Sequence, residues 1–306
     1  MLTKFWEVIG NKLADRWAAI SVPSLVFWLG GLLSWAYSRG GFSAFRAPSD
    51  SMGHQPVPTQ IALLLLALLG VASTAVIVQL LTIPVQRLLE GYWPLFLDPL
   101  RKRLVRRVMR RINSDVADWG NLIPRVSAGT ADSRDLILYA RLDQRIRRFP
   151  SNPSACMPTN IGNVMRAAQS RPYDKYGLDA ATVWPRLLLL LPATTRQEFE
   201  GAQIALSASV ATLIYSLGFF GFAVFTPLAI PIALGFVAIS SFLLIPSRAK
   251  TVADLLETVF DLHRSILYKQ LRWPLPTNPI EERQAGLALT EYIARGSDGS
   301  TPTFTT

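Results

Sequence analysis

The densest group of charged side chains in this 306-residue sequence is a run of seven basic residues. Apolar residues recur among them at helical spacing, so a helix here would be apolar on one face and basic on the other. The basic residues are Arg101, Lys102, Arg103, Arg106, Arg107, Arg110 and Arg111, and the apolar ones are Leu100, Leu104, Val105, Val108, Met109 and Ile112. Such a helix predicts binding to anionic lipid headgroups, with about 1 kcal/mol from each basic residue near the surface.

Two other interpretations of this basic run stay open. A solvated positive face could serve membrane topology alone, which the sequence supports as well as lipid binding. A basic helix is also the electrostatic footprint of a nucleic-acid-binding protein, but its place beside a membrane span argues against nucleic acid as a partner. The preceding segment, Tyr92-Trp93-Pro94-Leu95-Phe96-Leu97, has the aromatic and apolar composition of a segment at headgroup level.

Residues that could carry out catalysis are few and scattered. Asp115 and Asp118 lie three apart and could form an acid/base pair or hold a cation, although solvated carboxylates that balance the nearby cations explain them better. The two histidines, His54 and His263, are expected on opposite sides of a membrane, which argues against a zinc or histidine-dependent site. Cys156 is the single cysteine, which predicts a buried thiol and excludes a multi-cysteine metal centre. The sequence therefore predicts no catalytic residue, metal or cofactor.

The longest uncharged stretch predicts how these residues are positioned. Between Glu200 and Arg248, 47 consecutive residues contain no Asp, Glu, Lys or Arg. One bilayer crossing needs about 20 apolar residues, so this stretch suffices for two. Thr226-Pro227 and Pro231 interrupt it, since proline in a helix interior removes a hydrogen bond. We expect a transmembrane hairpin of Ala202–Phe225 and Leu228–Ile245.

The N-terminal part of the chain predicts two more spans. Residues 3–18 have the pattern of an amphipathic helix that lies in the membrane interface or packs on a soluble domain. Ala19–Ser38 follows as the first span, residues 40–60 form a Gly/Pro/Ser-rich loop without helical periodicity, and Gln60–Ile83 is the second span, ended by Pro84. The predicted fold is therefore all-α and polytopic, with four transmembrane helices.

The distribution of positive charge predicts orientation and domains. Of 31 Lys and Arg residues, 19 lie in residues 86–200, and short loops rich in these residues stay in the cytoplasm. Both termini are then cytoplasmic, and the expected location is a bacterial inner membrane. The predicted parts are 1–85 with the first two spans, a helical and loop-rich cytosolic domain at 86–200, the hairpin at 201–247, and cytosolic helices with a disordered tail at 248–306.

Within the cytosolic parts the sequence predicts one helix with an internal ion pair and one helix with an N-terminal cap. Ser133–Phe149 carries apolar residues on one face, and Asp143 can pair with Arg147 one turn away. Asn278 caps a last helix that runs to about Ala294. The fragments Pro158–Asn163 and Tyr176–Asp179 look specific, but no activity can be attached to them.

Two sets of residues bear on assembly. The small and hydroxyl residues Ala208, Ser209, Thr212, Tyr215 and Ser216 in the third span either line a water-filled path or allow close helix packing, and packing is the more frequent outcome. A short heptad-like seam of Val252, Leu255, Val259, Leu262 and Ile266 predicts self-association.

Three hypotheses of function follow. The first is an oligomeric membrane protein that forms or gates a pore under the control of its cytosolic domain, as an effector of a bacterial stress or defence response. The second is a non-conducting scaffold that recruits cytosolic partners, and the third is a lipid-handling enzyme that uses Asp115 and Asp118. The expected partners are an anionic bilayer, further copies of the chain, and a cytosolic protein or small-molecule regulator.

Overall fold

The computed structural model describes residues 22–296 and 303–304, and within these ranges the chain is helical, without a β-strand. The chain divides into two compact units. The first unit contains residues 1–86 and 207–245, and the second contains residues 87–206 and 246–306. The predicted interfacial helix at residues 3–18 and most of the predicted C-terminal tail lie outside the described residues.

Three helical segments in the described part are long and apolar enough to cross a membrane. They lie within Val57–Ser127, Ala193–Val224 and Ala229–Gln270. They correspond to the second, third and fourth predicted spans. The first predicted span, Ala19–Ser38, begins outside the described residues, and its residues 22–38 form a helix.

In the first unit, helix 22–38 packs against α3 (Val57–Glu90) and α8 (Ala193–Phe219). The buried Ser24 hydroxyl donates a 2.8 Å hydrogen bond to the carbonyl of Val71 on α3. On the other side, the rings of Phe27 and Tyr215 lie 5.5 Å apart, and a Cβ at Gly31 would overlap the ring of Phe222. Small residues thus permit close helix approach, as is typical in lipid.

Helix α3 buries one narrow face and exposes the rest. The buried residues Val71, Ala75, Val78 and Thr82 are spaced by four, three and four. The apolar residues Leu63, Leu64, Leu65 and Leu66 all lie exposed at 43 to 63%. A water-soluble monomer rarely exposes apolar patches of this size, so lipid or another protein surface must cover this face.

Two local predictions in this region are wrong. Pro84 does not end the second helix, because α3 continues to Glu90 with Pro84 inside it. A proline removes one backbone hydrogen bond, but the hydrogen bonds of the helical residues on both sides remain and keep the helix continuous. The 40–60 segment is not a loop throughout, since it contains η1 (Gly41–Phe45) and α2 (Arg46–Gly53). Pro48 lies in the first turn of α2, where its missing N–H leaves no hydrogen bond unmade.

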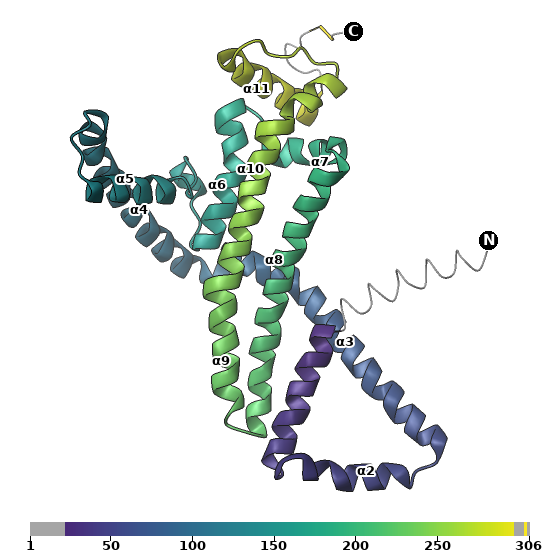
Figure 1. Ribbon diagram of the computed structural model, residues 1–306. Helices are drawn as coiled ribbons and strands as arrows, with labels where there is room; N and C mark the ends of the chain where they lie inside the picture. The colour runs from purple at the N-terminus through teal and green to yellow at the C-terminus, as the bar shows by residue number, and fades with distance from the viewer. Residues whose placement is uncertain (1–21, 297–302, 305–306) are drawn as a thin grey trace. The chain divides into compact units, whose positions relative to one another are not determined.

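The predicted helical hairpin is present, with helices longer than expected. Helix α8 starts at Ala193 and continues through η4 (Phe220–Val224). After the turn, α9 (Ala229–Ile239), a π-helical turn η5 (Ser240–Leu244) and α10 (Ile245–Gln270) follow without a break (Figure 1). Pro231 lies in the first turn of α9, so it does not interrupt a helix, whereas Pro246 lies inside the continuous stretch Ala229–Gln270, directly after the π turn. The wider π turn before Pro246 relieves the clash that its ring would make with the preceding turn.

The second unit is built around α10. Helices α6 (Asn160–Tyr176), α7 (Ala180–Leu190) and α11 (Pro279–Arg295) surround it, and α4 (Asp98–Ser127) pairs with α5 (Ser133–Ile146). Phe260 of α10 is fully buried, and Trp184 lies with its ring 4.6 Å from Phe199 and 5.9 Å from Phe260. The predicted cap of α11 is confirmed, because the Asn278 side chain accepts hydrogen bonds from two backbone N–H groups.

The fragment Pro158–Asn163 is a structural corner. The Thr159 hydroxyl accepts the N–H of Gly162 at 3.0 Å and caps α6. The Asn163 amide bonds both backbone groups of Met157, at 2.8 and 2.9 Å. A Cβ at Gly162 would overlap the carbonyl of Glu90, so α6 can meet the end of α3 here only through glycine.

The fragment Tyr176–Asp179 is a second corner, between α6 and α7. Gly177 ends α6 in the left-handed region at φ 71°, which favours glycine. Leu178 is fully buried, and Asp179 caps α7 by accepting the N–H of Thr182 at 3.0 Å. Helix α11 approaches this corner so closely that a Cβ at Gly286 would overlap the carbonyl oxygen of Tyr176.

This contact makes Gly286 a test of the packing of the second unit. We expect Gly286→Ala to lower the free energy of unfolding by about 1–3 kcal/mol, because the added methyl group meets rigid backbone. Gly120→Ala on α4 is the matched control, since nothing lies within 4 Å of its Cβ position, and it should be neutral or stabilising by up to about 1 kcal/mol. Thermal unfolding of the purified protein measures both, and equal effects would contradict the close contact.

Candidate functional site

The basic run lies on α4, which begins at Asp98 and Pro99. Asp98 accepts from Lys102 Nζ at 2.7 Å and from Arg101 Nε at 3.0 Å. Hydrogen bonds from Lys102 and then Arg101 lower the pKa of the Asp98 carboxyl below its usual value. Two of the seven predicted lipid-binding residues are therefore partly neutralised by their own helix.

The other basic residues on the outer face of α4 keep their charge uncompensated. Arg103, Arg106 and Arg110 line one groove with Met109 and Asn113. These three arginines and Arg107 are exposed, and within the described part of the chain none forms an ion pair. Their guanidinium groups are available to an external anion.

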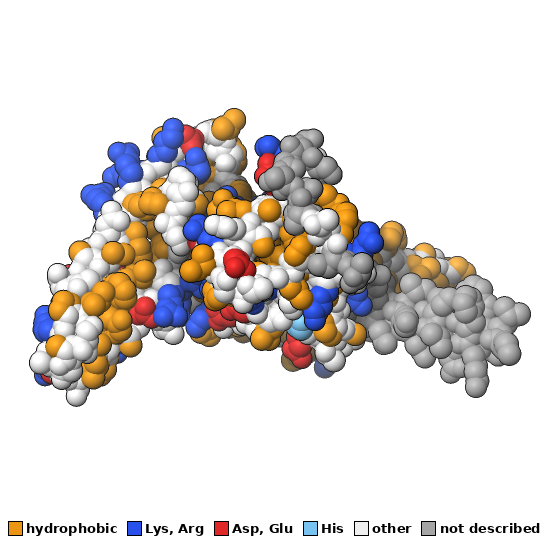
Figure 2. All heavy atoms as spheres, turned by 90° about the horizontal axis from the view of Figure 1, so that it is seen from above, with side chains coloured by type: hydrophobic (Ala, Val, Ile, Leu, Met, Phe, Trp, Pro, Cys, Tyr) orange, Lys and Arg blue, Asp and Glu red, His pale blue; other side chains and the backbone are white. Residues whose placement is uncertain are grey.

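The segment just before α4 exposes large apolar side chains. Leu95 and Phe96, in η2 (Leu95–Leu97), are 92% and 77% exposed, and Tyr92 is 50% exposed. Trp93 is half-buried and donates its indole N–H to the carbonyl of Leu88 at 2.8 Å. Figure 2 shows exposed hydrophobic side chains beside groups of Lys and Arg on the face it displays. Adjacent exposed apolar and cationic groups are the composition of a lipid headgroup contact.

The inner face of α4 is fixed by α5. Arg145 Nη1 donates to both carboxylate oxygens of Asp115, at 2.9 and 3.1 Å, and Asp115 is buried. Farther along the pair, the rings of Trp119 and Tyr139 stack at 5.7 Å. Asp115 is thus not the solvated carboxylate expected from the sequence, because a partner 30 residues away neutralises it. Asp118 is exposed, so the two acids have different surroundings and are not a matched acid/base pair.

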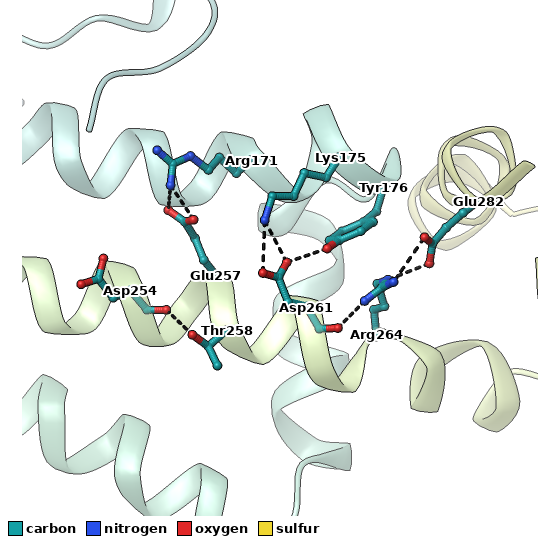
Figure 3. A network of polar contacts seen from close by, with 9 residues as sticks. All are labelled: Arg171, Lys175, Tyr176, Asp254, Glu257, Thr258, Asp261, Arg264 and Glu282. Atoms are coloured by element: carbon teal, nitrogen blue, oxygen red, sulfur yellow. Dashed lines mark hydrogen bonds and ion pairs between the residues drawn. The ribbon is translucent and has the colours of Figure 1, made fainter. Parts of the chain in front are cut away.

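A polar network holds α6 against α10 and α11 (Figure 3). Arg171 donates to both carboxylate oxygens of Glu257 at 2.5 Å. Asp261 accepts from the Tyr176 hydroxyl at 2.6 Å and from the Lys175 ammonium at 3.1 Å. Arg264 binds Glu282 at 2.6 Å and lies 4.0 Å above the ring of Tyr176. This network fixes the start of α11 and the end of α6 to one helix.

The predicted oligomer seam is mostly covered within the chain. Val252 and Val259 are buried, and Leu255 and Ile266 are half-buried. Leu262 is 68% exposed. Self-association through this seam stays a prediction, and Leu262 is the residue of the five that offers most free surface to a second copy.

The hydroxyl residues of the third span are partly enclosed. Ser209 and Ser216 are buried, Thr212 and Tyr215 are half-buried, and Ala208 is exposed. Ser216 donates to the carbonyl of Thr212 at 2.6 Å, and Thr212 donates to that of Ala208 at 2.9 Å. These bonds satisfy the hydroxyl groups of Thr212 and Ser216 within their own helix. The burial of Ser209 and Ser216 favours helix packing over a water-filled path at these two positions.

Two smaller predictions are confirmed. Cys156 is a buried free thiol, and burial raises its pKa, so it is a neutral thiol at pH 7. Asp143 and Arg147 pair at 2.9 Å, one helical turn apart. The sequence did not indicate the role of Arg145, because its partner Asp115 lies 30 residues away.

The network predicts a pH dependence through Tyr176. Burial, and then the hydrogen bond to Asp261, raises the pKa of the Tyr176 hydroxyl from 10 to about 12. A pKa raised by folding contributes stability that is complete below pH 10 and is lost as pH rises through 12. We therefore expect the stability difference between the wild type and Tyr176→Phe to stay constant up to about pH 9.5 and to shrink between pH 10 and 12. Unfolding curves of both proteins across this range measure it, and a constant difference would contradict the raised pKa of Tyr176.

Comparison with known proteins adds no function to this site. No protein-family model, curated protein or solved structure matches the chain. The function must therefore be argued from the chemistry of its own residues.

Proposed function

We propose that this chain is an integral membrane scaffold whose helix α4 binds the anionic surface of the membrane that its apolar helices cross. One observation supports this most: Leu95 and Phe96 are largely exposed directly before a row of arginines on α4 that form no ion pair among the described residues. In water this juxtaposition leaves apolar side chains without cover. At a headgroup plane the apolar groups enter the hydrocarbon boundary and the arginines reach the phosphates.

The same proposal assigns an orientation. The second unit, which holds the basic residues of 86–200, is cytoplasmic, and so are both termini, with four spans between them. A bacterial inner membrane fits this arrangement, because its cytoplasmic leaflet is anionic and its topology follows the positive residues. The scaffold would present the helices of the second unit to a cytosolic protein or a small-molecule regulator.

A charge-removal variant tests lipid binding. In nanodiscs, phosphatidylglycerol should stabilise the full-length protein relative to phosphatidylcholine alone, and salt should weaken the effect. The triple variant Arg103→Gln, Arg106→Gln, Arg110→Gln should lose about 3 kcal/mol of that stabilisation, from about 1 kcal/mol per basic residue. Thermal unfolding at two phosphatidylglycerol contents gives the measurement.

The control variant changes the same charge elsewhere in the second unit. Arg134→Gln, Arg141→Gln, Arg166→Gln removes three exposed arginines that lie on α5 and α6. It should keep the stabilisation by phosphatidylglycerol. If both triple variants behave alike, net charge and not the α4 face is responsible, and the proposal fails.

A conducting oligomer is the second candidate, and the exposed face of α3 favours it. This helix buries one narrow face within the chain, so a second copy could cover part of the remainder. In the polar stripe Ala208 is exposed and Thr212 and Tyr215 are half-buried, and a path for water would have to pass Ala208 and Thr212.

Leucine substitutions separate the two candidates. Ala208→Leu and Thr212→Leu should abolish ion flux in liposomes while particle size is unchanged, because bulky apolar groups narrow and dewet a path. Ser216→Leu is the packing control: Ser216 is buried, so this change should instead destabilise the chain. Absence of flux from the wild type, or normal flux from intact Ala208→Leu and Thr212→Leu particles, would exclude this stripe as a pore.

A further inference from the structure

A cavity of about 360 Å³ lies behind the exposed face of α4, between α4, α5 and the start of α6. Its volume falls in the range of small-ligand sites, which begins at about 300 Å³. The residues that line it are Val108, Arg111, Ile112 and Asp115 of α4, Arg145 of α5, Arg148 and Phe149 just after α5, and Asn160 and Asn163 of α6. The groove lined by Arg103, Arg106 and Arg110 is separate from it.

The charges around this cavity do not balance. Three arginines, Arg111, Arg145 and Arg148, line it together with one carboxylate residue, Asp115. The buried Asp115 carboxylate already accepts hydrogen bonds from Nη1 of Arg145 and holds that guanidinium group in place. Within the described part of the chain, neither Arg111 nor Arg148 forms an ion pair. Like charges that converge on one cavity repel each other, and an anion between them would relieve the repulsion.

The remaining walls determine what kind of anion fits. Helix α6 begins at the cavity with Asn160, and the N-terminus of a helix carries a partial positive charge that favours anions. Val108, Ile112 and Phe149 supply an apolar wall. Asn163 lies at the rim but is structural, because Met157 and Thr159 use its amide. The combination suits a doubly charged phosphate group that carries an apolar or aromatic remainder.

A neighbouring cavity of about 210 Å³ has the same excess of positive over acidic residues, but it has two carboxylates instead of one. It is lined by Arg147, Arg148, Arg171 and Lys250, but also by Asp254 and Glu257. Two of its arginines are already paired, Arg147 with Asp143 and Arg171 with Glu257. This leaves Arg148 and Lys250 with one carboxylate, Asp254, at the smaller cavity, whereas at the larger one Arg111 and Arg148 have only Asp115, which already binds Arg145.

We propose that the larger cavity binds the phosphate group of a phosphomonoester or pyrophosphate ligand, with Arg111 and Arg148 contacting the phosphate oxygens and Asp115 positioning Arg145 for a third contact. The ligand is either a lipid with a terminal phosphate or a soluble organic phosphate. This site is distinct from the outer face of α4, so it can exist whether or not that face binds the membrane.

Calorimetric titration of the full-length protein in phosphatidylcholine nanodiscs tests the site with two probes. Inorganic pyrophosphate represents the soluble source, and dihexanoyl phosphatidic acid represents the lipid source. At least one of them should bind saturably with one site per chain. Saturation by dihexanoyl phosphatidic acid alone assigns the lipid source, saturation by pyrophosphate alone assigns the soluble source, and saturation by both shows that the phosphate group suffices.

Two single substitutions locate the binding. Arg148→Gln and the exposed Arg111→Gln should each weaken binding roughly ten- to hundredfold, the effect of losing a hydrogen bond to a charged group. Arg148→Lys should recover part of the affinity, because it keeps the charge but not the paired donors. Arg141→Gln on α5, which removes the same charge outside the cavity, should bind like the wild type.

Three results would overturn the assignment. They are the absence of saturable binding for both probes, unchanged affinity in Arg148→Gln and Arg111→Gln, or an equal loss in Arg141→Gln. Circular dichroism of each variant establishes that it is folded, and Arg111→Gln, at an exposed position, covers the case in which Arg148→Gln does not fold. The outcome is independent of the phosphatidylglycerol test, which depends on Arg103, Arg106 and Arg110.

Discussion

A stretch of 47 residues without a charged side chain, between Glu200 and Arg248, is the constraint on which the rest of this structure depends. Such a stretch cannot remain solvated in water as a helical hairpin with apolar side chains on every face. The lipid interior has no water to hydrogen-bond to the backbone, so every N–H and C=O must be paired within the protein. An α-helix is the structure in which a single segment makes all of these hydrogen bonds by itself. The prolines obey the same constraint, because Pro231 occupies the first turn of α9 and Pro246 follows the π turn Ser240–Leu244, which makes room for it.

The uncharged hairpin also determines where polar chemistry can lie. Charged side chains concentrate in the second unit, where α6, α7, α10 and α11 form a buried core and a network of ion pairs. Helix α4 differs from these helices because its inner face packs against α5 while its outer face is exposed. The inner face is held by the Asp115–Arg145 pair and the Trp119–Tyr139 stack, and the outer face carries arginines without a partner in the described chain. Even an exposed ion pair contributes little to the stability of a fold, and these arginines form none. The outer arginines are therefore not needed for the fold and are available for binding.

The sequence predicted those features that local rules control. The hairpin follows from the absence of charge, the Asn278 cap from a polar residue before Pro279, and the Asp143–Arg147 pair from a separation of one turn. The same local rules failed where neighbours outweigh them. Pro84 was expected to end a helix that continues to Glu90, and the helix Arg46–Gly53 has no apolar periodicity to indicate it.

Features that depend on distant residues could not be predicted. Asp115 meets Arg145 across 30 residues, and Arg171 meets Glu257 across 86. Gly162 and Gly286 look like ordinary helical glycines in the sequence, yet at each position a backbone carbonyl from another element leaves no room for a Cβ. The cavity behind α4 combines side chains from three helices, so its arginines could be named from the sequence but not brought together.

The central claim is that residues 92–97 and the start of α4 lie at a lipid headgroup plane, and a depth measurement tests it most directly. Because Cys156 is the single cysteine, Cys156→Ala gives a background in which one nitroxide label can be placed at position 96 or, as a reference, at the exposed position 134. Electron paramagnetic resonance of the reconstituted protein compares collisions with oxygen, which partitions into lipid, and with a water-soluble nickel chelate. We expect the label at position 96 to favour oxygen and the label at position 134 to favour nickel. Equal nickel accessibility at both positions would place Phe96 in water and contradict the account.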